Sequence, residues 1–583
     1  MAEAEPAVTN ELIQNKITGA KRRQLFTCFM FLILLFPRTR FGESSRESVY
    51  GPAQRQRRQV FSAGVGLRIY LLVQPLKYRT HWREQCCEGT LACYHFKPVG
   101  TLNFDRYHAA MGDASYKDAT RVHGKPLSEI TATFYCTQRK LPFAPVLGHE
   151  RLVRLLVDSQ IDRPRLRFLE QDRGGLQRFA KAIEDIQFAG RIRTVRPGTI
   201  MFPQQPIADI AGKFGLTQAQ EIKFEHAFDL PMTTASMAMQ FRMAAGDRWL
   251  SDFSLRRNGD IERAVDIATY AFIGGFNDTS NMEAAHRLDI PAVGTEAHYW
   301  QQAYLEYLYE PEIEERTGRP KHFEQVAFER WLDANPNGTT LLLDTIDVYL
   351  GAVHAVMAAT SNDARRKAFK GFRVDSGDLA ELAKWCLQLF EANGLRGLRP
   401  NLTGDLNVDK LKQIVAEFPQ AAGFGIGTKL SSEVRNVAGV IFKACEIDGR
   451  PTLKASNSLD KTTLPGRMQV FRGIDATGNY VADVTGLDDE QIEIAGASHV
   501  DRLLLPFWEN GQHSSIPSIE KQKAFVADQM NRFRDLHNYP RTLSDRLAKL
   551  RDDLTEQMRA DNSGWEKILK LPEEMPEELI NAK

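Results

Sequence analysis

The sequence has almost no net charge, few cysteines and no long apolar run. Lys plus Arg number 75 and Asp plus Glu number 74, which gives a formal net charge of +1. Proteins that bind nucleic acid broadly need a basic surface, so this balance argues against a nucleic-acid partner and allows only a local basic pocket for small anions. The seven cysteines are odd in number and lack metal-ligand spacing, which predicts reduced thiols rather than disulfides or a zinc finger.

The most apolar stretch lies near the N-terminus and is short. Residues 25–36 read LFTCFMFLILLF, whereas a helix that spans a bilayer needs about 20 apolar residues, so no stable membrane span is predicted. The length fits a signal peptide, but no small-x-small cleavage pattern follows, and the nearby Lys and Arg leave an organelle-targeting peptide open. We therefore set residues 1–100 aside as an N-terminal extension of uncertain status and expect a cytoplasmic protein.

Residues 101–229 predict an N-terminal β-rich domain. Residues 132–143, ATFYCTQRKLPF, begin as an alternating strand. Residues 191–210 alternate polar and apolar side chains between Pro and Gly, as short antiparallel strands joined by tight turns do. Residues 230–245 are rich in Met and Ala with few helix breakers and predict a buried helix that leads into the next domain.

Residues 230–435 predict an α/β barrel, because strand, polar loop and helix repeat along the chain. Buried strands are predicted at residues 340–346, 370–374, 400–402 and 423–426. Such repeated units form a parallel sheet through right-handed crossovers, and in a barrel the functional loops follow the carboxyl ends of the strands. We therefore expect the chemistry in these loops.

The stretch from residue 272 to residue 300, FIGGFNDTSNMEAAHRLDIPAVGTEAHYW, is the expected centre of that chemistry. The apolar residues 290–293 predict a short buried strand that ends at Gly294, and the polar residues 277–280 suit the cap of a short helix. His298 follows at once. A lone His is more often a surface or satisfied core residue, so its weight comes from its context.

Two further segments carry no chemistry that the sequence reveals. Residues 306–335 are highly charged and predict a solvated helical insertion of unknown role. Residues 436–583 predict a β-hairpin segment, turned at Asp448 and Gly449, that packs with the N-terminal domain. Two charged amphipathic helices are predicted within residues 519–560.

The motifs of this chain resemble those of the nicotinate phosphoribosyltransferase family. They read Gly-Gly-Phe-Asn-Asp-Thr-Ser-Asn from Gly274, Ile-Pro-Ala-Val-Gly-Thr-Glu-Ala-His up to His298, Arg-Val-Asp-Ser-Gly-Asp from Arg373, and Gly-Ile-Gly-Thr up to Thr428. They occur in family order, and the resemblance extends from about Thr101 to about Gly478. It implies a type II phosphoribosyltransferase-like irregular α/β barrel with an additional β-rich α+β domain.

The resemblance implies roles for the residues at the matching positions. His298 is expected to be phosphorylated by ATP, Tyr107 to stack on the pyridine ring across a dimer interface, and Arg373 to contact nicotinate. Further substrate contacts are expected from Thr295, Arg256, Gly427 and Thr428, and metal ligands from Asp375 and Asp378. A surface ion pair remains an equal interpretation of Arg256, whereas glycines let the backbone of the loop at Thr428 approach an anion.

The implied reaction moves the phosphoribosyl group of 5-phosphoribosyl 1-pyrophosphate to the ring nitrogen of nicotinate, with ATP hydrolysis, as the first step of NAD synthesis from nicotinate. Mg²⁺ is the expected cofactor, ATP the co-substrate and a homodimer the expected form. A nicotinamide or quinolinate phosphoribosyltransferase and an inactive binding protein on the same scaffold remain as alternatives. The form Gly-Thr-x-Ala-His favours the nicotinate enzyme, and the presence of His298, Arg373, Asp375 and Thr428 together argues against a binding protein.

Overall fold

The computed structural model describes residues 102–157, 161–184, 190–431, 437–456 and 462–560. All of them lie within one compact unit, Thr90–Lys583. The N-terminal extension, including the apolar stretch at residues 25–36, falls outside the described residues. Among the helices described, none is both long enough and apolar enough to cross a membrane.

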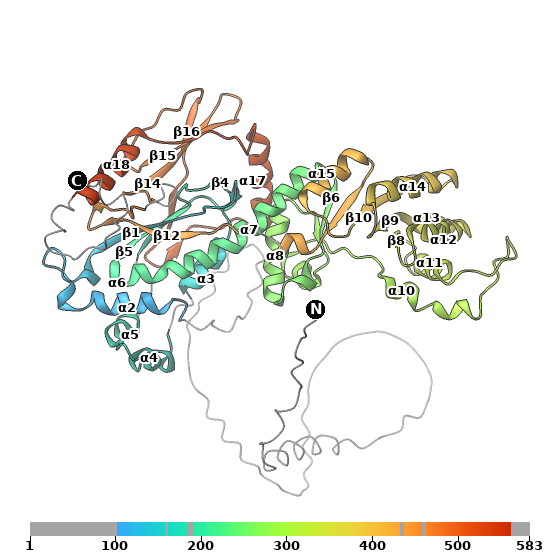
Figure 1. Cartoon of the computed structure of the whole chain (residues 1–583), viewed down its shortest axis with the longest axis horizontal. Coiled ribbons are helices and arrows are strands. Elements are labelled where there is room, and N and C mark those ends of the chain that lie inside the picture. The colour runs from blue at the N-terminus through green and yellow to red at the C-terminus, as the bar shows by residue number, and fades with distance from the viewer. Residues whose placement is uncertain (1–101, 158–160, 185–189, 432–436, 457–461, 561–583) are drawn as a thin grey trace, which may run out of the picture. The chain divides into compact units, whose positions relative to one another are not determined.

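The first part of the chain combines short helices with antiparallel strands (Figure 1). Its elements are α2 (Arg106–Ser115), η1 (Asp118–Thr120), η2 (Leu127–Glu129), β1 (Thr131–Thr137), β2 (Ala144–Pro145), α3 (His149–Val157), α4 (Arg163–Glu170), α5 (Gln177–Ile183), β3 (Arg191–Thr194), β4 (Ile200–Met201), β5 (Ala208–Lys213), α6 (Phe214–Thr217) and η3 (Gln218–Gln220). β5 pairs antiparallel with both β1 and β3. The antiparallel strands predicted at residues 191–210 are confirmed.

The C-terminal part of the chain adds four strands to the same sheet and forms a separate four-stranded sheet. Its elements are β12 (Ile441–Ile447), β13 (Arg450–Pro451), β14 (Met468–Ile474), β15 (Tyr480–Leu487), β16 (His499–Arg502), β17 (Leu505–Glu509), β18 (Gln512–His513), α17 (Ile519–Arg532), β19 (Arg541–Leu543) and α18 (Asp545–Ala560). β12 pairs with β1 and β17 with β3, so one seven-stranded sheet has the order β13-β12-β1-β5-β3-β17-β18. Asp448 and Gly449 have φ of 50° and 75°, which confirms the predicted hairpin turn.

A long helix, α7 (Glu221–Ala245), leads from the β-rich part into the parallel sheet. It begins earlier than the predicted buried helix and includes Pro231, a residue that removes one backbone donor from a helix. Ala227 and Phe228 belong to the core of the seven-stranded sheet, whereas Ala238 and Phe241 belong to the core of the parallel sheet. Burial on several faces explains why its sequence shows no clear apolar stripe.

The second part of the chain alternates strands and helices. Its elements are β6 (Trp249–Asp252), η4 (Leu255–Arg257), α8 (Ile261–Ile273), β7 (Asp278–Thr279), α9 (Met282–Leu288), α10 (His298–Gln302), η5 (Leu305–Leu308), α11 (Phe323–Ala334), β8 (Thr339–Leu342), α12 (Val348–Thr360), α13 (Asp363–Ala368), β9 (Phe369–Val374), α14 (Leu379–Ala392), β10 (Arg399–Leu402), α15 (Val408–Glu417), β11 (Gly423–Ile426) and α16 (Thr428–Ser431). The six strands have the order β7-β6-β11-β10-β9-β8, and every neighbouring pair is parallel. The predicted α/β fold with a curled parallel sheet is confirmed.

The buried strand predicted at residues 290–293 is wrong. The polar cluster before it supplies β7 instead, and Ala292 forms only an isolated bridge to Thr279. The Thr279 N–H donates to the Pro291 carbonyl at 3.1 Å, and the Val293 N–H donates to the Thr279 carbonyl at 3.0 Å. Pro291 has no N–H of its own and is exposed, so the run cannot form a buried ladder.

The solvated insertion predicted at residues 306–335 is also wrong for its last third, because α11 is largely buried. Its charged side chains have partners from elsewhere in the chain. Glu329 accepts a hydrogen bond from Lys321 Nζ at 3.0 Å and forms an ion pair with Arg365 at 3.0 Å. The many charged residues predicted a solvent-exposed segment, but charged side chains can be buried when they are paired.

Candidate active site

Four neighbouring strands end in loops that carry polar side chains. β8 is followed by Asp344 and Thr345, β9 by Asp375 and Ser376, β10 by Thr403, and β11 by Gly427 and Thr428. The carboxyl ends of parallel strands meet at one edge of a sheet, so these loops share one side. The Thr403 hydroxyl donates to Asp375 Oδ1, and the Ser376 hydroxyl donates to Asp344 Oδ2 at 2.7 Å. Adjacent loops are therefore joined by hydrogen bonds.

His298 is the first residue of α10 and faces the loop that follows β8. Its Nδ1 lies 3.1 Å from the Thr345 hydroxyl, and its Nε2 lies 4.0 Å from Asp344 Oδ1. The His298 side chain is 39% exposed, whereas Asp344 is 5% exposed and its Oδ1 has no hydrogen-bond partner. The imidazole is thus held on one side and accessible to a small molecule on another.

Arg373, at the end of β9, reaches the loop that carries His298. Its guanidinium donates to the Thr295 hydroxyl at 2.5 Å and to the Glu296 carbonyl at 3.3 Å, while the buried Nε–H has no partner. Burial lowers the pKa of Arg373, nearby carboxylates oppose this effect, and the positive charge of Arg256 adds to it. The structure therefore brings Arg373, Thr295 and Arg256 into one electrostatic neighbourhood with a donor left for an anion.

Glu296 is a buried carboxyl that the sequence did not single out. The Leu342 N–H at the end of β8 donates to Glu296 Oε1 at 2.8 Å, and Oε2 has no partner. Burial raises the pKa of Glu296 to about 8. Glu296 occupies the variable position of the Gly-Thr-x-Ala-His motif. The one signal in the sequence was a charged residue among small neighbours. Glu296 ties the loop of His298 to the sheet.

Replacing Glu296 by Gln is expected to change the pH dependence of stability. In the unfolded chain the carboxyl ionises near pH 4.5, and in the folded chain near pH 8. Between these values the folded protein binds more protons, so the wild-type free energy of unfolding falls as pH rises, by on the order of a few kcal/mol across the window. The Gln side chain does not ionise, so the variant does not lose this stability as pH rises. Denaturant unfolding at pH 5 and pH 8 should show that the free energy of unfolding of the variant rises relative to that of wild type as the pH increases. The same pH dependence in both proteins would contradict the assignment.

Gly404 permits the close approach of two site loops. Its φ is 99°, and a Cβ there would lie 2.1 Å from the Asp375 carbonyl oxygen. Gly404→Ala should lower the free energy of unfolding by about 3 kcal/mol and displace Asp375, because backbone strain and overpacking add. Gly397→Ala is the matched control, since its φ of 74° is also positive but nothing lies near its Cβ; it should cost about 1 kcal/mol. Equal melting temperatures and activities for the two variants would refute this account.

The structure groups the metal-type ligands differently from the expected pair. His298, Asp344 and Asp375 each offer a ligand atom, and these atoms lie within 4.8 Å of one another. Asp378 instead caps α14, where it accepts a hydrogen bond from the Glu381 N–H at 3.0 Å. Asp344 was missed because the predicted strand, residues 340–346, included it. The polar pair Asp344 and Thr345 after an apolar run was a signal that the strand had already ended.

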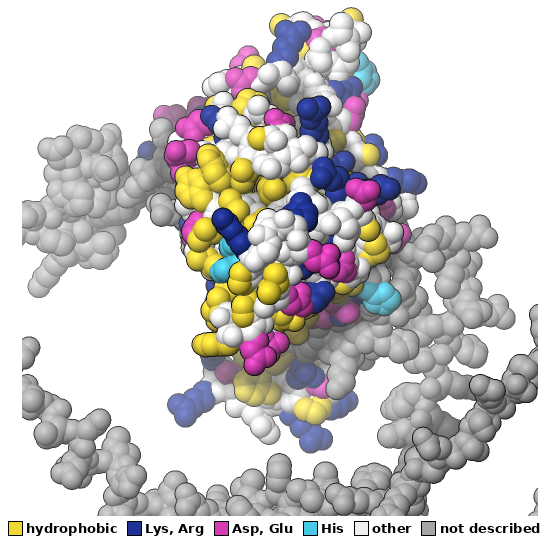
Figure 2. Space-filling model, turned by 90° about the vertical axis from the view of Figure 1, so that its right-hand side faces the viewer, with side chains coloured by type: hydrophobic (Ala, Val, Ile, Leu, Met, Phe, Trp, Pro, Cys, Tyr) yellow, Lys and Arg dark blue, Asp and Glu magenta, His cyan; other side chains and the backbone are white. Residues whose placement is uncertain are grey.

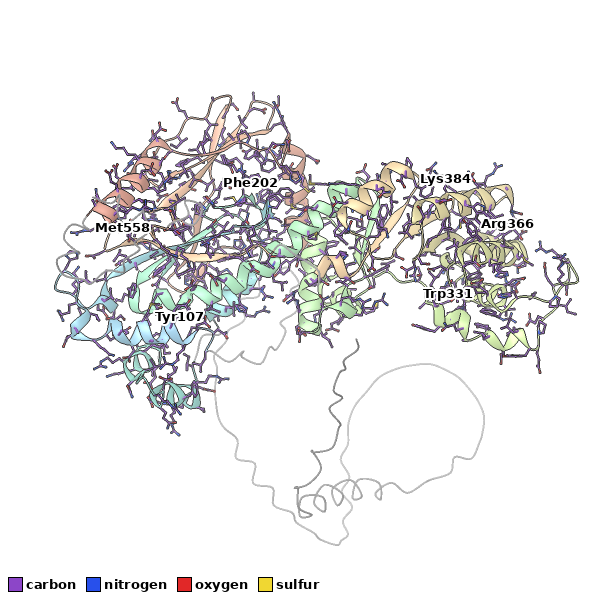
Figure 3. The ribbon with its side chains drawn as sticks, viewed as in Figure 1. Tyr107, Phe202, Trp331, Arg366, Lys384 and Met558 are labelled. Atoms are coloured by element: carbon purple, nitrogen blue, oxygen red, sulfur yellow. The ribbon has the colours of Figure 1, made fainter. Side chains whose placement is uncertain are left out.

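Tyr107 lies on α2, in the β-rich part of the chain. The residue is 47% exposed, and its hydroxyl donates to Glu221 Oε2 at 2.8 Å. His108, the next residue, also contacts Glu221 Oε2, at 2.9 Å. Among the contacts of the described residues, none joins Tyr107 to the strand-end loops of the same chain. Figure 3 labels it on its helix.

One cavity among the described residues has a different lining from these loops. A cavity of about 460 Å³ is lined by Arg257, Arg263 and Ser431 among others, but not by His298 or Arg373. On the face shown in Figure 2, Lys and Arg side chains are interspersed with Asp and Glu, in keeping with the near-zero net charge. The loops at the strand ends therefore remain the candidate active site.

Comparisons with known proteins agree with the motifs. Residues 249–492 match the model of the nicotinate phosphoribosyltransferase (NAPRTase) family. The chain is 28% identical over 474 residues to a nicotinate phosphoribosyltransferase of Mycobacterium tuberculosis, which covers 78% of this chain and 94% of the relative. It is 27% identical over 410 residues to the nicotinate phosphoribosyltransferase of Bacillus subtilis, with 68% and 79% covered.

A solved structure shares the fold. The crystal structure of human nicotinic acid phosphoribosyltransferase matches with a TM-score of 0.62 at 21% identity, over 77% of this chain and 99% of the human chain. Every predicted site residue except Tyr107 lies within the residues that match the family. On these grounds, residues 249–492 resemble the nicotinate phosphoribosyltransferase family.

Proposed function

We propose that this protein transfers the phosphoribosyl group of 5-phosphoribosyl 1-pyrophosphate to nicotinate, forming nicotinate mononucleotide and pyrophosphate, the first step of NAD synthesis from nicotinate. The family and its named relatives support the reaction. The observation that carries the proposal is the contact of Arg373 with Thr295, beside His298, at the carboxyl edge of the parallel sheet.

Arg373 fits the carboxylate of nicotinate. A guanidinium paired with a carboxylate forms charge-assisted hydrogen bonds that the neutral amide of nicotinamide cannot match. The buried, unpartnered Nε–H of Arg373 is a donor that a bound anion would satisfy. Thr295 and the Glu296 carbonyl fix the other side of the guanidinium, so the side chain is oriented before substrate binds.

The phosphates of the second substrate fit the loop after β11. At Gly427 the backbone is open to an anion, because a Cβ there would meet only the Phe253 carbonyl, at 3.6 Å. Thr428 and Arg256 are the further proposed contacts to these phosphates. As pyrophosphate leaves C1 of the ribose, positive charge develops on the sugar, and the ring nitrogen of nicotinate must lie in line to attack.

The carboxylates of Asp344 and Asp375 fit a magnesium ion. Mg²⁺ prefers oxygen ligands, and Asp344 Oδ1 is a buried oxygen without a partner. Bound there, Mg²⁺ would neutralise phosphate charge during the transfer. Asp378 is a weaker second ligand than Asp344, because its carboxylate caps α14.

His298 is the proposed acceptor of the γ-phosphoryl group of ATP, with Nε2 as the nucleophilic atom. Nδ1 contacts the Thr345 hydroxyl, so we assign the tautomer in which Nδ1–H donates to Thr345 and Nε2 keeps its lone pair. Nε2 forms the new bond to phosphorus as the bond to ADP breaks. The added negative charge would reorder the loop and couple ATP cleavage to transfer.

The exposed position of Tyr107 supports the proposal of a homodimer with shared sites. Tyr107→Ala subunits and His298→Ala subunits should each be inactive in the coupled reaction, and a mixture should regain about a quarter of wild-type activity through mixed dimers. Tyr309→Ala, which removes another exposed ring, serves as the control and should stay active alone. A monomeric mass in solution together with no regained activity would rule out the shared site.

The reaction itself is tested by product analysis with nicotinate, 5-phosphoribosyl 1-pyrophosphate and Mg²⁺, with and without ATP. We expect nicotinate mononucleotide and pyrophosphate in equal amounts, and a higher rate with ATP together with ADP release. The proposal is overturned if neither mixture yields nicotinate mononucleotide. If transfer occurs but ATP is not cleaved, only the ATP coupling fails.

A further inference from the structure

Helices α11 and α12 bring two imidazoles and a carboxyl group together, apart from the loops described above. His322 caps α11, Glu324 lies in its first turn, and His354 lies in α12. Each offers a ligand atom, and the three atoms lie within 4.8 Å of one another. Trp331, labelled in Figure 3, marks the same helix α11. No role in the proposed reaction uses these side chains.

The contacts within this cluster leave one buried acceptor unsatisfied. His354 Nδ1 lies 2.7 Å from Glu324 Oε2, and the His322 and His354 rings stack with centroids 4.2 Å apart and planes 7° apart. His322 Nδ1 accepts from the Glu324 N–H at 3.2 Å. Glu324 is fully buried, yet its Oε1 has no hydrogen-bond partner. A buried carboxylate oxygen without a partner is costly, which calls for a ligand.

We propose that His322, Glu324 and His354 bind a divalent transition-metal ion of the zinc class. Imidazole and carboxylate together suit Zn²⁺ and its neighbours in the periodic table, whereas Mg²⁺ prefers an all-oxygen set. Two ligands of one tetrahedral ion lie about 3.3 Å apart, so the stacked rings would tilt toward each other to place both ring nitrogens on one ion. An ion held by Glu324 would also satisfy its unpaired oxygen.

The charges around the cluster favour a cation. Burial raises the pKa of Glu324, and the nearby carboxylates of Asp347 and Asp344 raise it further. Burial and the neighbouring His354 lower the pKa of His322 to about 4, so its ring is neutral at physiological pH, as a metal ligand must be. A divalent cation would offset the negative charge of these carboxylates.

A metal here would stabilise the loop that holds His298. α11 precedes β8 and α12 follows the loop with Asp344 and Thr345, so the ion would join the two helices that flank this strand. Glu324 and Glu329 are buried on the same helix, but Glu329 already pairs with Lys321 and Arg365. Because the ion would join two helices, we assign this site a structural role, which does not depend on the proposed reaction.

The test is a Co²⁺ titration of the full chain after chelator treatment, without substrates, followed by visible absorption and thermal unfolding with Zn²⁺. With excess Mg²⁺ present to fill the proposed site at Asp344 and Asp375, we expect a saturable absorption band for one further ion per chain. We also expect a higher melting temperature with Zn²⁺ than with Mg²⁺ alone. Glu324→Gln keeps the shape of the side chain, and His322→Asn keeps a preferred helix cap. Each should weaken Co²⁺ binding at least about a hundredfold, since loss of a ligand exceeds loss of an outer contact.

His286→Asn, at an exposed His outside both clusters, is the matched control and should bind Co²⁺ as wild type does. His298→Asn removes a ligand atom of the other cluster, so a band that persists in this variant reports the site at His322, Glu324 and His354. If Glu324→Gln unfolds, His322→Asn decides the question. The proposal is overturned if wild type shows no saturable band, if both variants bind as well as wild type, or if only His298→Asn loses the band.

Discussion

Arg373→Ala is expected to lower kcat/KM for nicotinate about a hundredfold, because removing a charged hydrogen-bond partner costs about 2–3 kcal/mol and leaves a carboxylate unpaired. KM for 5-phosphoribosyl 1-pyrophosphate should change little. Steady-state kinetics with each substrate varied in turn gives both numbers. The ratio of kcat/KM for nicotinate to kcat/KM for nicotinamide should fall as well, because nicotinamide has no charge-assisted bond to lose.

Two further variants separate charge from geometry at this position. Arg373→Lys keeps the charge but loses the planar fork that Thr295 and the Glu296 carbonyl hold, so it should recover only part of the nicotinate affinity. Arg366→Ala removes an exposed Arg on α13, labelled in Figure 3, and should leave kinetics unchanged. Equal losses for both substrates in Arg373→Ala would contradict the role in nicotinate selection.

His298→Ala is expected to abolish ATP hydrolysis and the stimulation of transfer by ATP, while a slow ATP-independent transfer remains. The reason is that only the proposed phosphoryl acceptor is removed; the proposed contacts of Arg373 and Thr428 to the two transfer substrates would remain. Measuring ADP release and nicotinate mononucleotide in the same reaction separates the two effects. Rates should fall by at least about a hundredfold for the ATP-dependent part.

The phosphorylated residue can be identified directly. Wild type incubated with γ-labelled ATP should carry an acid-labile, base-stable phosphate, and Asp344→Asn should alter its amount because Asp344 faces Nε2. His286→Ala removes an exposed His of the same region and is the control. A label that persists on His298→Ala protein would assign the phosphate to another side chain.

The parallel-strand half of the fold was predictable because its signals are local. The strand at residues 423–426 was predicted with its observed bounds, and the helices within residues 519–560 matched as well. Apolar runs bounded by glycine or polar loops carry this information in the sequence itself. The hairpin at Asp448 and Gly449 was equally local, because positive φ suits these residues.

The errors arose where distant residues decide the structure. Glu329 is buried because Lys321 and Arg365 reach it, and a charge count cannot show that pairing. Glu296 depends on the Leu342 N–H of a separate strand. Pro291 is different, because its missing donor was visible in the sequence and should have excluded a ladder.

The identity of the pyridine substrate tests the central claim most directly. The protein is given equal amounts of ring-deuterated nicotinate, unlabelled nicotinamide and unlabelled quinolinate, together with 5-phosphoribosyl 1-pyrophosphate, ATP and Mg²⁺. The mononucleotides that form are then separated by mass. The label matters because quinolinate would yield the same mononucleotide after loss of one carboxyl group. Our account predicts deuterated nicotinate mononucleotide as the main product; unlabelled nicotinate mononucleotide or nicotinamide mononucleotide as the main product would contradict it.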